Sequence, residues 1–198
     1  MTNTNTATLT IENITTKGKR GPLFLGFKKQ EDYLYSRNGN IAITATSGQG
    51  GTNLSNVILI QTAHRLDNLD NLVFVGVKTT GFRQFIEKGA KSVTEPEDVL
   101  KKLKEMSCEV SDTEQVLYID NIDYFLDKTN HSILPFLLDL ITRRNVQVIT
   151  CNHSHSKLHN LFTNTLDATE NLGEFVKESE SENLTYKIQV PFVDMSKY

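Results

Sequence analysis

Short apolar runs alternate with segments of helical periodicity along most of the chain. Residues 41–45, 72–77, 115–119 and 146–150 are nearly continuous apolar runs, which is typical of strands buried on both faces. Between the first two runs, apolar residues such as Leu54, Val57 and Ile58 recur at helical spacing. Strands that alternate with helices predict an α/β fold: a doubly wound, mainly parallel sheet with helices on both faces.

The flanking segments predict smaller elements. Alternating apolar residues between 22 and 36 predict a short strand pair, and residues 184–190 predict a final strand. A short helix is expected at residues 157–162, followed by an acidic stretch at residues 170–182 that is expected to be a surface loop or, alternatively, a contact segment. We expect residues 1–20 to be a flexible N-terminal lead-in and residues 21–198 to form a single domain.

Two helices carry sharper expectations. Thr94 and Glu97 have the spacing of a capping box, which predicts Thr94 as the N-cap of a helix with Leu103 on its buried face. Residues 133–141 are apolar on nearly every side and predict a buried helix, in which Pro135 is tolerated because it falls in the first turn.

Composition narrows the classes of function. The 198 residues suffice for one domain with a substantial core, and the net charge of −3 disfavours a duplex-DNA footprint. Cys108 and Cys151 are too few for a disulfide framework and, without a signal peptide, fit a reducing cytosolic compartment. The apolar runs are shorter than the roughly 20 residues of a spanning helix, so membrane contact is expected only through other parts of a longer protein.

A Gly-rich segment lies between the first apolar strand and its helix, where a phosphate-binding loop belongs. The usual pattern, G-x-x-x-x-G-K-[ST], uses backbone N–H groups and a lysine to hold phosphates, and its Ser/Thr to hold Mg²⁺. Here Ala45 stands for the first glycine and Gly51 for the lysine, whereas Gly50 and Thr52 are in place. The candidate nucleotide-binding residues are Thr46, Ser47, Gly48, Gln49, Gly50, Gly51, Thr52 and Asn53.

Loss of the lysine weakens this site. Removing one partner of a buried charge pair costs about 2–5 kcal/mol, so ATP and Mg²⁺ are expected to bind weakly or not at all. Gly51→Lys alone is then expected to raise ATP affinity without restoring much hydrolysis. The alternative is a Gly-rich turn without any ligand.

The strand at 115–119 ends in a second candidate group. Asp120 has the position of a Walker B aspartate that would support Mg²⁺ together with Thr52. The acid that usually follows is replaced by Asn121, whose amide cannot accept a proton. No catalytic residue is therefore assigned, and independent hydrolysis is not expected.

These segments resemble the FtsK/SpoIIIE-type ATPases. Residues 45–56 follow the loop G-T-T-G-S-G-K-S-V-x-x-N position by position, including the terminal Asn56, and residues 119–122 are similar to V-D-E-F. Residues 145–153 resemble the strand that carries a sensor glutamine, which places His153 at the sensor position. The resemblance covers roughly residues 21–190 and implies a RecA/FtsK-like P-loop NTPase fold.

Eroded motifs resemble those of the last of three ATPase modules in the EssC/EccC coupling proteins of type VII secretion. That resemblance implies a bacterial cytoplasmic module of a cell-membrane protein. The implied partners are other ATPase modules of the same polypeptide and WXG100-type secreted substrates, with no nucleic acid. The implied role is substrate recognition and regulation of export; the alternatives are a trans-completed ATPase motor and a DNA-translocase module.

Two polar clusters leave alternatives open. His153, His155 and His159 are either polar residues at the rim of the site or metal ligands, although zinc sites usually add a Cys or carboxylate. Arg143 and Arg144 follow an apolar helix, where cations favour the helix dipole. The alternative for this pair is an arginine finger that acts on a neighbouring module.

Overall fold

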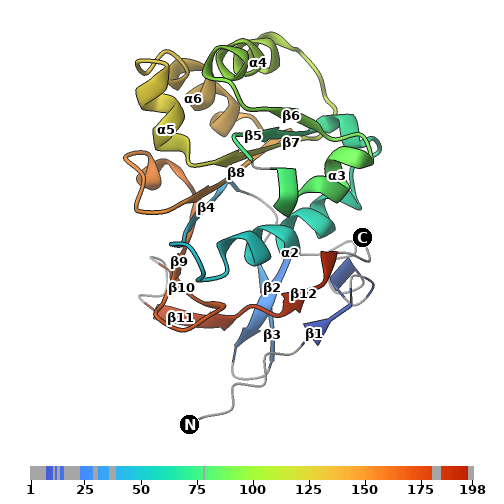
Figure 1. Ribbon diagram of the computed structural model, residues 1–198, viewed down its shortest axis with the longest axis vertical. Helices are drawn as coiled ribbons and strands as arrows, with labels where there is room; N and C mark the ends of the chain where they lie inside the picture. The colour runs from blue at the N-terminus through green and yellow to red at the C-terminus, as the bar shows by residue number, and fades with distance from the viewer. Residues whose placement is uncertain are drawn as a thin grey trace.

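The computed structural model describes residues 8–10, 12, 14–15, 23–28, 31–35, 39–77, 79–179 and 184–195 (Figure 1). The strands are β1 (Thr8–Leu9), β2 (Leu23–Lys28), β3 (Glu31–Tyr35), β4 (Ile41–Thr44), β5 (Leu72–Val75), β6 (Lys91–Val93), β7 (Gln115–Asp120), β8 (Val146–Asn152), β9 (Asn164–Ala168), β10 (Glu174–Ser179), β11 (Leu184–Gln189) and β12 (Phe192–Val193). The helices are α2 (Gly51–Ala63), α3 (Arg83–Glu87), α4 (Pro96–Cys108), α5 (Ile122–Lys128) and α6 (Leu134–Thr142). Three 3-10 turns are η1 (Leu69–Asn71), η2 (Thr79–Gly81) and η3 (His159–Leu161).

Ten strands form one sheet in the order β3-β2-β11-β10-β9-β4-β8-β7-β5-β6. From β9 to β6 neighbouring strands are parallel, and from β9 to β3 they are antiparallel. The predicted parallel sheet and the predicted N-terminal strand pair are both confirmed. Within the parallel half, β8 lies between β4 and β7, so the strands that carry the two candidate motifs are not direct neighbours.

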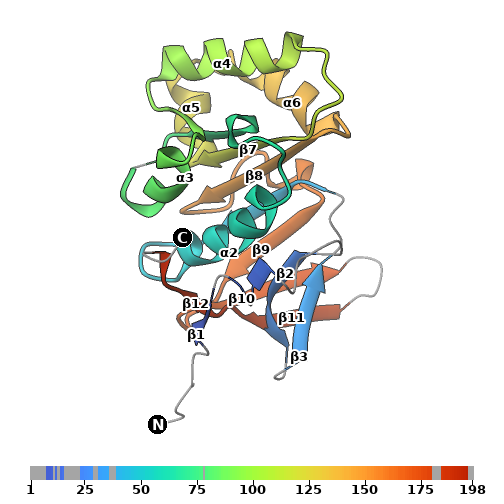
Figure 2. The same ribbon diagram turned by 90° about the vertical axis from the view of Figure 1, so that its right-hand side faces the viewer.

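Helices cover both faces of the parallel half, as predicted. Phe74 and Tyr118 belong to the core on the α2 and α3 side, whereas Val73 and Leu117 belong to the core under α4, α5 and α6. This split follows from the period of two along a strand, because neighbouring residues point to opposite faces. Figure 2 shows α2 and α3 on one side of β7 and β8, with α5 and α6 on the other.

The acidic loop expected at residues 170–182 is wrong in part, because β10 begins at Glu174. Phe175 is fully buried and pairs with the buried Ile188 of β11, while three of the other five residues of β10 are charged. One buried aromatic residue therefore fixes a strand in a segment whose charge indicated a loop. The expected helix at 157–162 is only the 3-10 turn η3.

Two further predictions about helices are corrected. The N-cap of α4 is Glu95 rather than Thr94, because Pro96 opens the helix at its first turn. Helix α6 is not buried all round: it packs on α4 and β8 through Leu137 and Leu140, whereas Leu138 remains 38% exposed. Pro135 does lie in the first turn.

A two-stranded sheet pairs a segment near the N-terminus with one near the C-terminus. Thr8 and Leu9, within the expected lead-in, pair in parallel with Phe192 and Val193, and residues 1–7 lie outside the described residues. Among the described helices, none has the length and apolar character needed to cross a membrane.

Candidate functional site

A cavity of about 470 Å³ lies at the carboxyl ends of β4, β7 and β8, where ligands bind in open α/β sheets. Nearly all of the predicted site residues contribute to its wall. They are Thr46, Ser47, Gly48, Gly50, Gly51, Thr52, Asn53, Asp120 and His153. Gln49 and Asn121 do not line it.

The Gly-rich loop begins a buried helix through left-handed glycines. Gly48 and Gly50 have φ values of 86° and 99°, which glycine adopts readily, and Gly50 is the N-cap of α2. The positive end of the helix dipole and the free N–H groups of the first turn therefore face the cavity. This part of an anion site is in place.

Gln49 ties the loop to the turn before β10. Its Oε1 accepts a hydrogen bond from the Thr46 amide at 2.7 Å, and its Nε2 donates to the Thr169 carbonyl at 3.1 Å. Its backbone carbonyl accepts from the Gly173 amide at 3.1 Å. The Thr46 amide is thus already hydrogen-bonded within the protein, and one donor of the loop is taken.

Position 51 has no room for a side chain. A Cβ on Gly51 would lie 2.9 Å from the Ala45 Cβ and 2.9 Å from the Cys151 Sγ. In the usual loop the residue types are reversed, with glycine at the first position and lysine at the second. The two departures at Ala45 and Gly51 are therefore spatially coupled: a methyl group at one position fills the space that the other would need.

A neutral hydrogen-bonded pair lies beneath the loop. The Ser55 hydroxyl donates to the Gly51 carbonyl at 2.9 Å, so the Tyr118 hydroxyl must donate to Ser55 Oγ, 3.1 Å away. Desolvation by burial, with nearby Cys151 and Asp120, raises the pKa of Tyr118 well above its usual value. Desolvation and Asp120 also raise the pKa of the Cys151 thiol to about 12. Both groups are therefore protonated at neutral pH.

Asp120 and Asn121 have different surroundings. Asp120 ends β7 and lines the cavity. Asn121 is left-handed, with φ 56°, and its side chain accepts from the Tyr124 amide as the N-cap of α5. Asparagine tolerates the left-handed conformation and is a good N-cap residue. The capping of α5 therefore accounts for asparagine at position 121, where related motifs have a catalytic acid.

Asn152 connects the two motifs. Its backbone carbonyl accepts from the Ala45 amide at 2.9 Å, and its side-chain Oδ1 accepts from the Ile122 amide at 2.9 Å. Asn152 is 4% exposed and is the last residue of β8, which lies between β4 and β7, the strands that carry the two motifs. Sequence reasoning included Asn152 only as part of a resemblance and missed this bridging position.

Asn53 has a structural partner. Its Nδ2 donates to the Pro191 carbonyl at 2.7 Å, and its Oδ1 accepts from the Val193 amide at 3.0 Å. The side chain thereby holds β12 against the start of α2. Asn53 lines the cavity, but both polar atoms of its side chain are hydrogen-bonded to residues 191 and 193.

Sequence reasoning missed the apolar rim of the cavity. Leu172 is 71% exposed and Phe192 55% exposed, and both line the cavity together with Val190 and Phe82. Leu172, Val190 and Phe192 come from segments more than 100 residues beyond the loop, and no local spacing signals this. Among the described residues that line the cavity, none is Lys or Arg.

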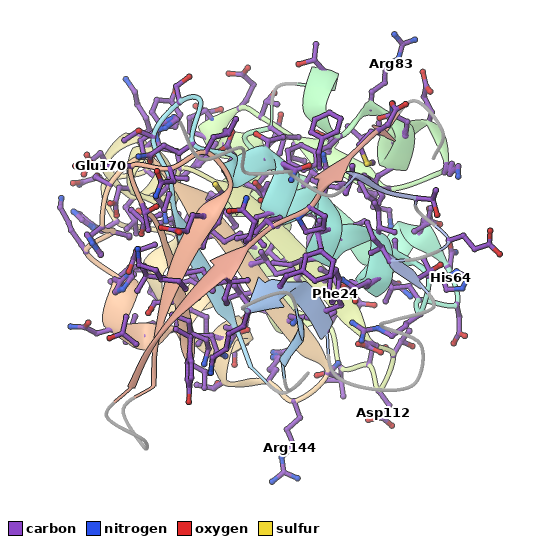
Figure 3. The ribbon with its side chains drawn as sticks, turned by 90° about the horizontal axis from the view of Figure 1, so that it is seen from below. Phe24, His64, Arg83, Asp112, Arg144 and Glu170 are labelled. Atoms are coloured by element: carbon purple, nitrogen blue, oxygen red, sulfur yellow. The ribbon has the colours of Figure 1, made fainter. Side chains whose placement is uncertain are left out.

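The structure separates the members of the two polar clusters, the three histidines and the arginine pair. His153 lines the cavity, whereas His155 and His159 lie beside Asp167 in a different group. Arg143 is the C-cap of α6, and its side chain donates to the carbonyls of Met106, Ser107 and Glu109 at the end of α4. Arg144 points outward at the edge of the molecule (Figure 3), before β8 begins and thus at the opposite end of that strand from the cavity.

Comparisons with known proteins agree on the fold. No protein-family model matches the chain, and no curated protein sequence matches it significantly. Among solved structures, the cytoplasmic domain of EssC matches with a TM-score of 0.68 at 12% identity, over 94% of this chain and 47% of that one. Thermomonospora curvata EccC (ATPases 2 and 3), in complex with a signal sequence peptide, matches with a TM-score of 0.66 at 9% identity, over 89% of this chain and 41% of that one.

A third match is the pCW3 conjugation coupling protein TcpA, whose monomer was solved with ATPγS. Its TM-score is 0.72 at 12% identity, over 91% of this chain and 68% of that one. The chain thus spans less than half of the EssC and EccC structures and about two thirds of TcpA. At such low identity the matches establish architecture: the chain has the P-loop fold of FtsK-like ATPase modules and resembles those of EccC, EssC and TcpA.

Proposed function

We propose that this chain is a degenerate FtsK-like module of a type VII secretion coupling protein, and that it serves substrate recognition and regulation of export rather than efficient ATP hydrolysis. The observation that carries the proposal is the filled space at position 51. The Ala45 Cβ and the Cys151 Sγ occupy the place from which a phosphate-binding lysine would start. Without that cation, a triphosphate would meet the Asp120 carboxylate and no described cationic side chain in the cavity.

The second support is the orientation of Asn121. Its side chain caps α5 and lies outside the cavity, so it cannot position an attacking water there. A lysine and a general base perform complementary tasks in phosphoryl transfer. Their combined absence supports a module that responds to partners instead of turning over nucleotide.

Calorimetric titration with Mg-ATP, paired with a phosphate-release assay, tests this proposal. We expect binding weaker than micromolar and no turnover above that of an Asp120→Asn variant. Micromolar binding with turnover that Asp120→Asn abolishes would overturn the proposal. That result would favour the motor alternative, which the retained Thr52 and Asp120 leave chemically open when a neighbouring module supplies the missing charge.

The partners are part of the same proposal. A Thermomonospora curvata EccC structure of the same fold contains a signal sequence peptide, which supports WXG100-type secreted proteins as the substrates here. The other proposed partners are ATPase modules of the same polypeptide, within the cytoplasmic part of a bacterial cell-membrane protein. No nucleic acid is proposed, in keeping with the net charge of −3.

The apolar rim of the cavity is the surface that we propose for substrate contact. Leu172 and Phe192 expose large apolar side chains beside a hollow, and such residues mark contact surfaces. Leu172→Asp with Phe192→Asp is expected to weaken binding of a WXG100-type dimer at least tenfold in a calorimetric assay. Val110→Asp is the matched control, because Val110 is fully exposed and does not line the cavity. Equal affinities for wild type and the double variant would place the contact elsewhere.

A further inference from the structure

Three metal-binding side chains meet beside the sheet, outside the cavity. His155 lies in the connection after β8, His159 begins η3, and Asp167 lies on β9 opposite Thr44 of β4. One ligand atom from each lies within 4.8 Å of the others. The two imidazole rings are 4.7 Å apart between centroids, and His155 Nδ1 is 3.8 Å from Asp167 Oδ1.

The carboxylate oxygen in this group has no hydrogen-bond donor. Asp167 Oδ1 is buried, and no described residue donates to it. The distance of 3.8 Å to His155 is too long for a hydrogen bond. A buried carboxylate oxygen without a donor is unfavourable, so this oxygen lacks a hydrogen-bonding partner.

The distances suit a bridging cation better than a direct contact. Two tetrahedral zinc ligands, each about 2.0–2.1 Å from the ion, lie about 3.4 Å apart. The present separations of up to 4.8 Å need an inward movement of about 1.5 Å or less to reach that value. Rotation of His155, whose side chain is 66% exposed, can supply part of that movement.

We propose that His155, His159 and Asp167 bind one zinc ion, with water in the fourth position. Two imidazoles and one carboxylate are a ligand set of zinc, whereas Mg²⁺ and Ca²⁺ prefer oxygen ligands throughout. The bound ion would fix the connection between β8 and β9 onto β9, next to the strand that leads into the Gly-rich loop. This inference does not depend on the proposed function.

Calorimetric titration with ZnCl₂ tests the site, using the 198-residue chain without an affinity tag and after treatment with a chelator. We expect one equivalent to bind, and His155→Gln, His159→Gln and Asp167→Asn each to weaken the affinity at least tenfold. His153→Gln and His64→Gln are the matched controls and should bind as wild type does. His153 lies outside the cluster, and His64 is at the opposite edge from Glu170 in Figure 3.

A spectroscopic measurement on the unmodified protein complements the variants. Co²⁺ in a tetrahedral site gives intense visible absorption, which we expect to appear with one equivalent and to vanish when Zn²⁺ is added. Absence of stoichiometric binding by wild type would overturn the proposal. Equal loss of affinity in His153→Gln, or unchanged affinity in a folded Asp167→Asn protein, would overturn it as well.

Discussion

Ala45 and Gly51 lie at the two ends of the loop, and the space between them holds one methyl group but not two. The Ala45 Cβ already occupies it, with the Cys151 Sγ alongside. A lysine placed at position 51 must therefore displace atoms of the core before it can reach a phosphate. The sequence-based expectation that Gly51→Lys alone raises ATP affinity is revised on this ground.

Gly51→Lys alone is expected to lower the free energy of unfolding by about 1–3 kcal/mol, the usual cost of overpacking. Ala45→Gly and Cys151→Ala remove the two contacting atoms, so the triple variant should recover part of that loss. It should also bind Mg-ATP at least tenfold more tightly than wild type. Urea unfolding and calorimetry measure the two effects, and a single variant as stable as wild type would contradict the steric argument.

Cys151 makes a second prediction at this scale. Its pKa of about 12 leaves almost no thiolate at pH 8, and the thiolate is the reactive form. Iodoacetamide at pH 8 is therefore expected to modify the exposed Cys108 while Cys151 reacts only after unfolding. Peptide mapping by mass spectrometry reads out both sites in one sample, with Cys108 as the internal control. Rapid labelling of Cys151 in folded protein would contradict the partly buried, protonated state.

Among the elements, the turn at residues 169–173 depends on one carboxylate. Thr169, Asn171 and Lys187 donate to Glu174 Oε1 at 2.9, 3.3 and 3.2 Å. Desolvation by burial opposes ionisation, but these three donors outweigh it and lower the pKa of Glu174. The ionised form therefore stabilises the turn that carries Leu172 into the cavity rim.

Glu174→Gln is expected to loosen this turn, because an amide oxygen accepts these hydrogen bonds less strongly than a carboxylate. Hydrogen exchange of residues 169–173 should accelerate several-fold, while exchange in α4 stays unchanged. Low pH should act in the same way: because the pKa of Glu174 is lowered in the folded state, the stabilisation is present above the ordinary glutamate pKa and is lost as pH falls through the lowered one. Glu87→Gln is the control, because Glu87 forms an exposed ion pair with Arg83. If Glu87→Gln accelerated exchange of residues 169–173 as much as Glu174→Gln does, a specific role for Glu174 would be contradicted.

At the same scale, the parallel strands were predictable and β10 was not. The parallel strands are buried on both faces, so they appear in the sequence as nearly continuous apolar runs. In β10 the charged residues Glu174, Lys177 and Glu178 surround the apolar pair Phe175 and Val176, and the partner strand that pairs with Phe175 lies beyond a turn. The N-cap at Glu95 was missed because Pro96 decides where the helix begins.

For the whole molecule, motif order placed half of the cavity correctly. The loop, Asp120 and His153 come from strand ends, and parallel strands bring those ends to one edge of the sheet. Leu172 and Val190 reach the same cavity from the ends of the antiparallel strands β10 and β11, and Phe192 reaches it from the separate strand β12; none of these pairings is visible in local spacing. Asp167 escaped notice as a partner of His155 for the same reason.

Asn152 connects the Gly-rich loop to helix α5 through two hydrogen bonds. One residue holds both the entry to the Gly-rich loop and the first turn of α5, so a displacement at either end pulls on the other. The two hydrogen bonds of Asn152 couple these segments in both directions, and this coupling does not require ATP hydrolysis. A ligand or protein that shifts the loop is therefore expected also to shift the first turn of α5, on the far face of the sheet.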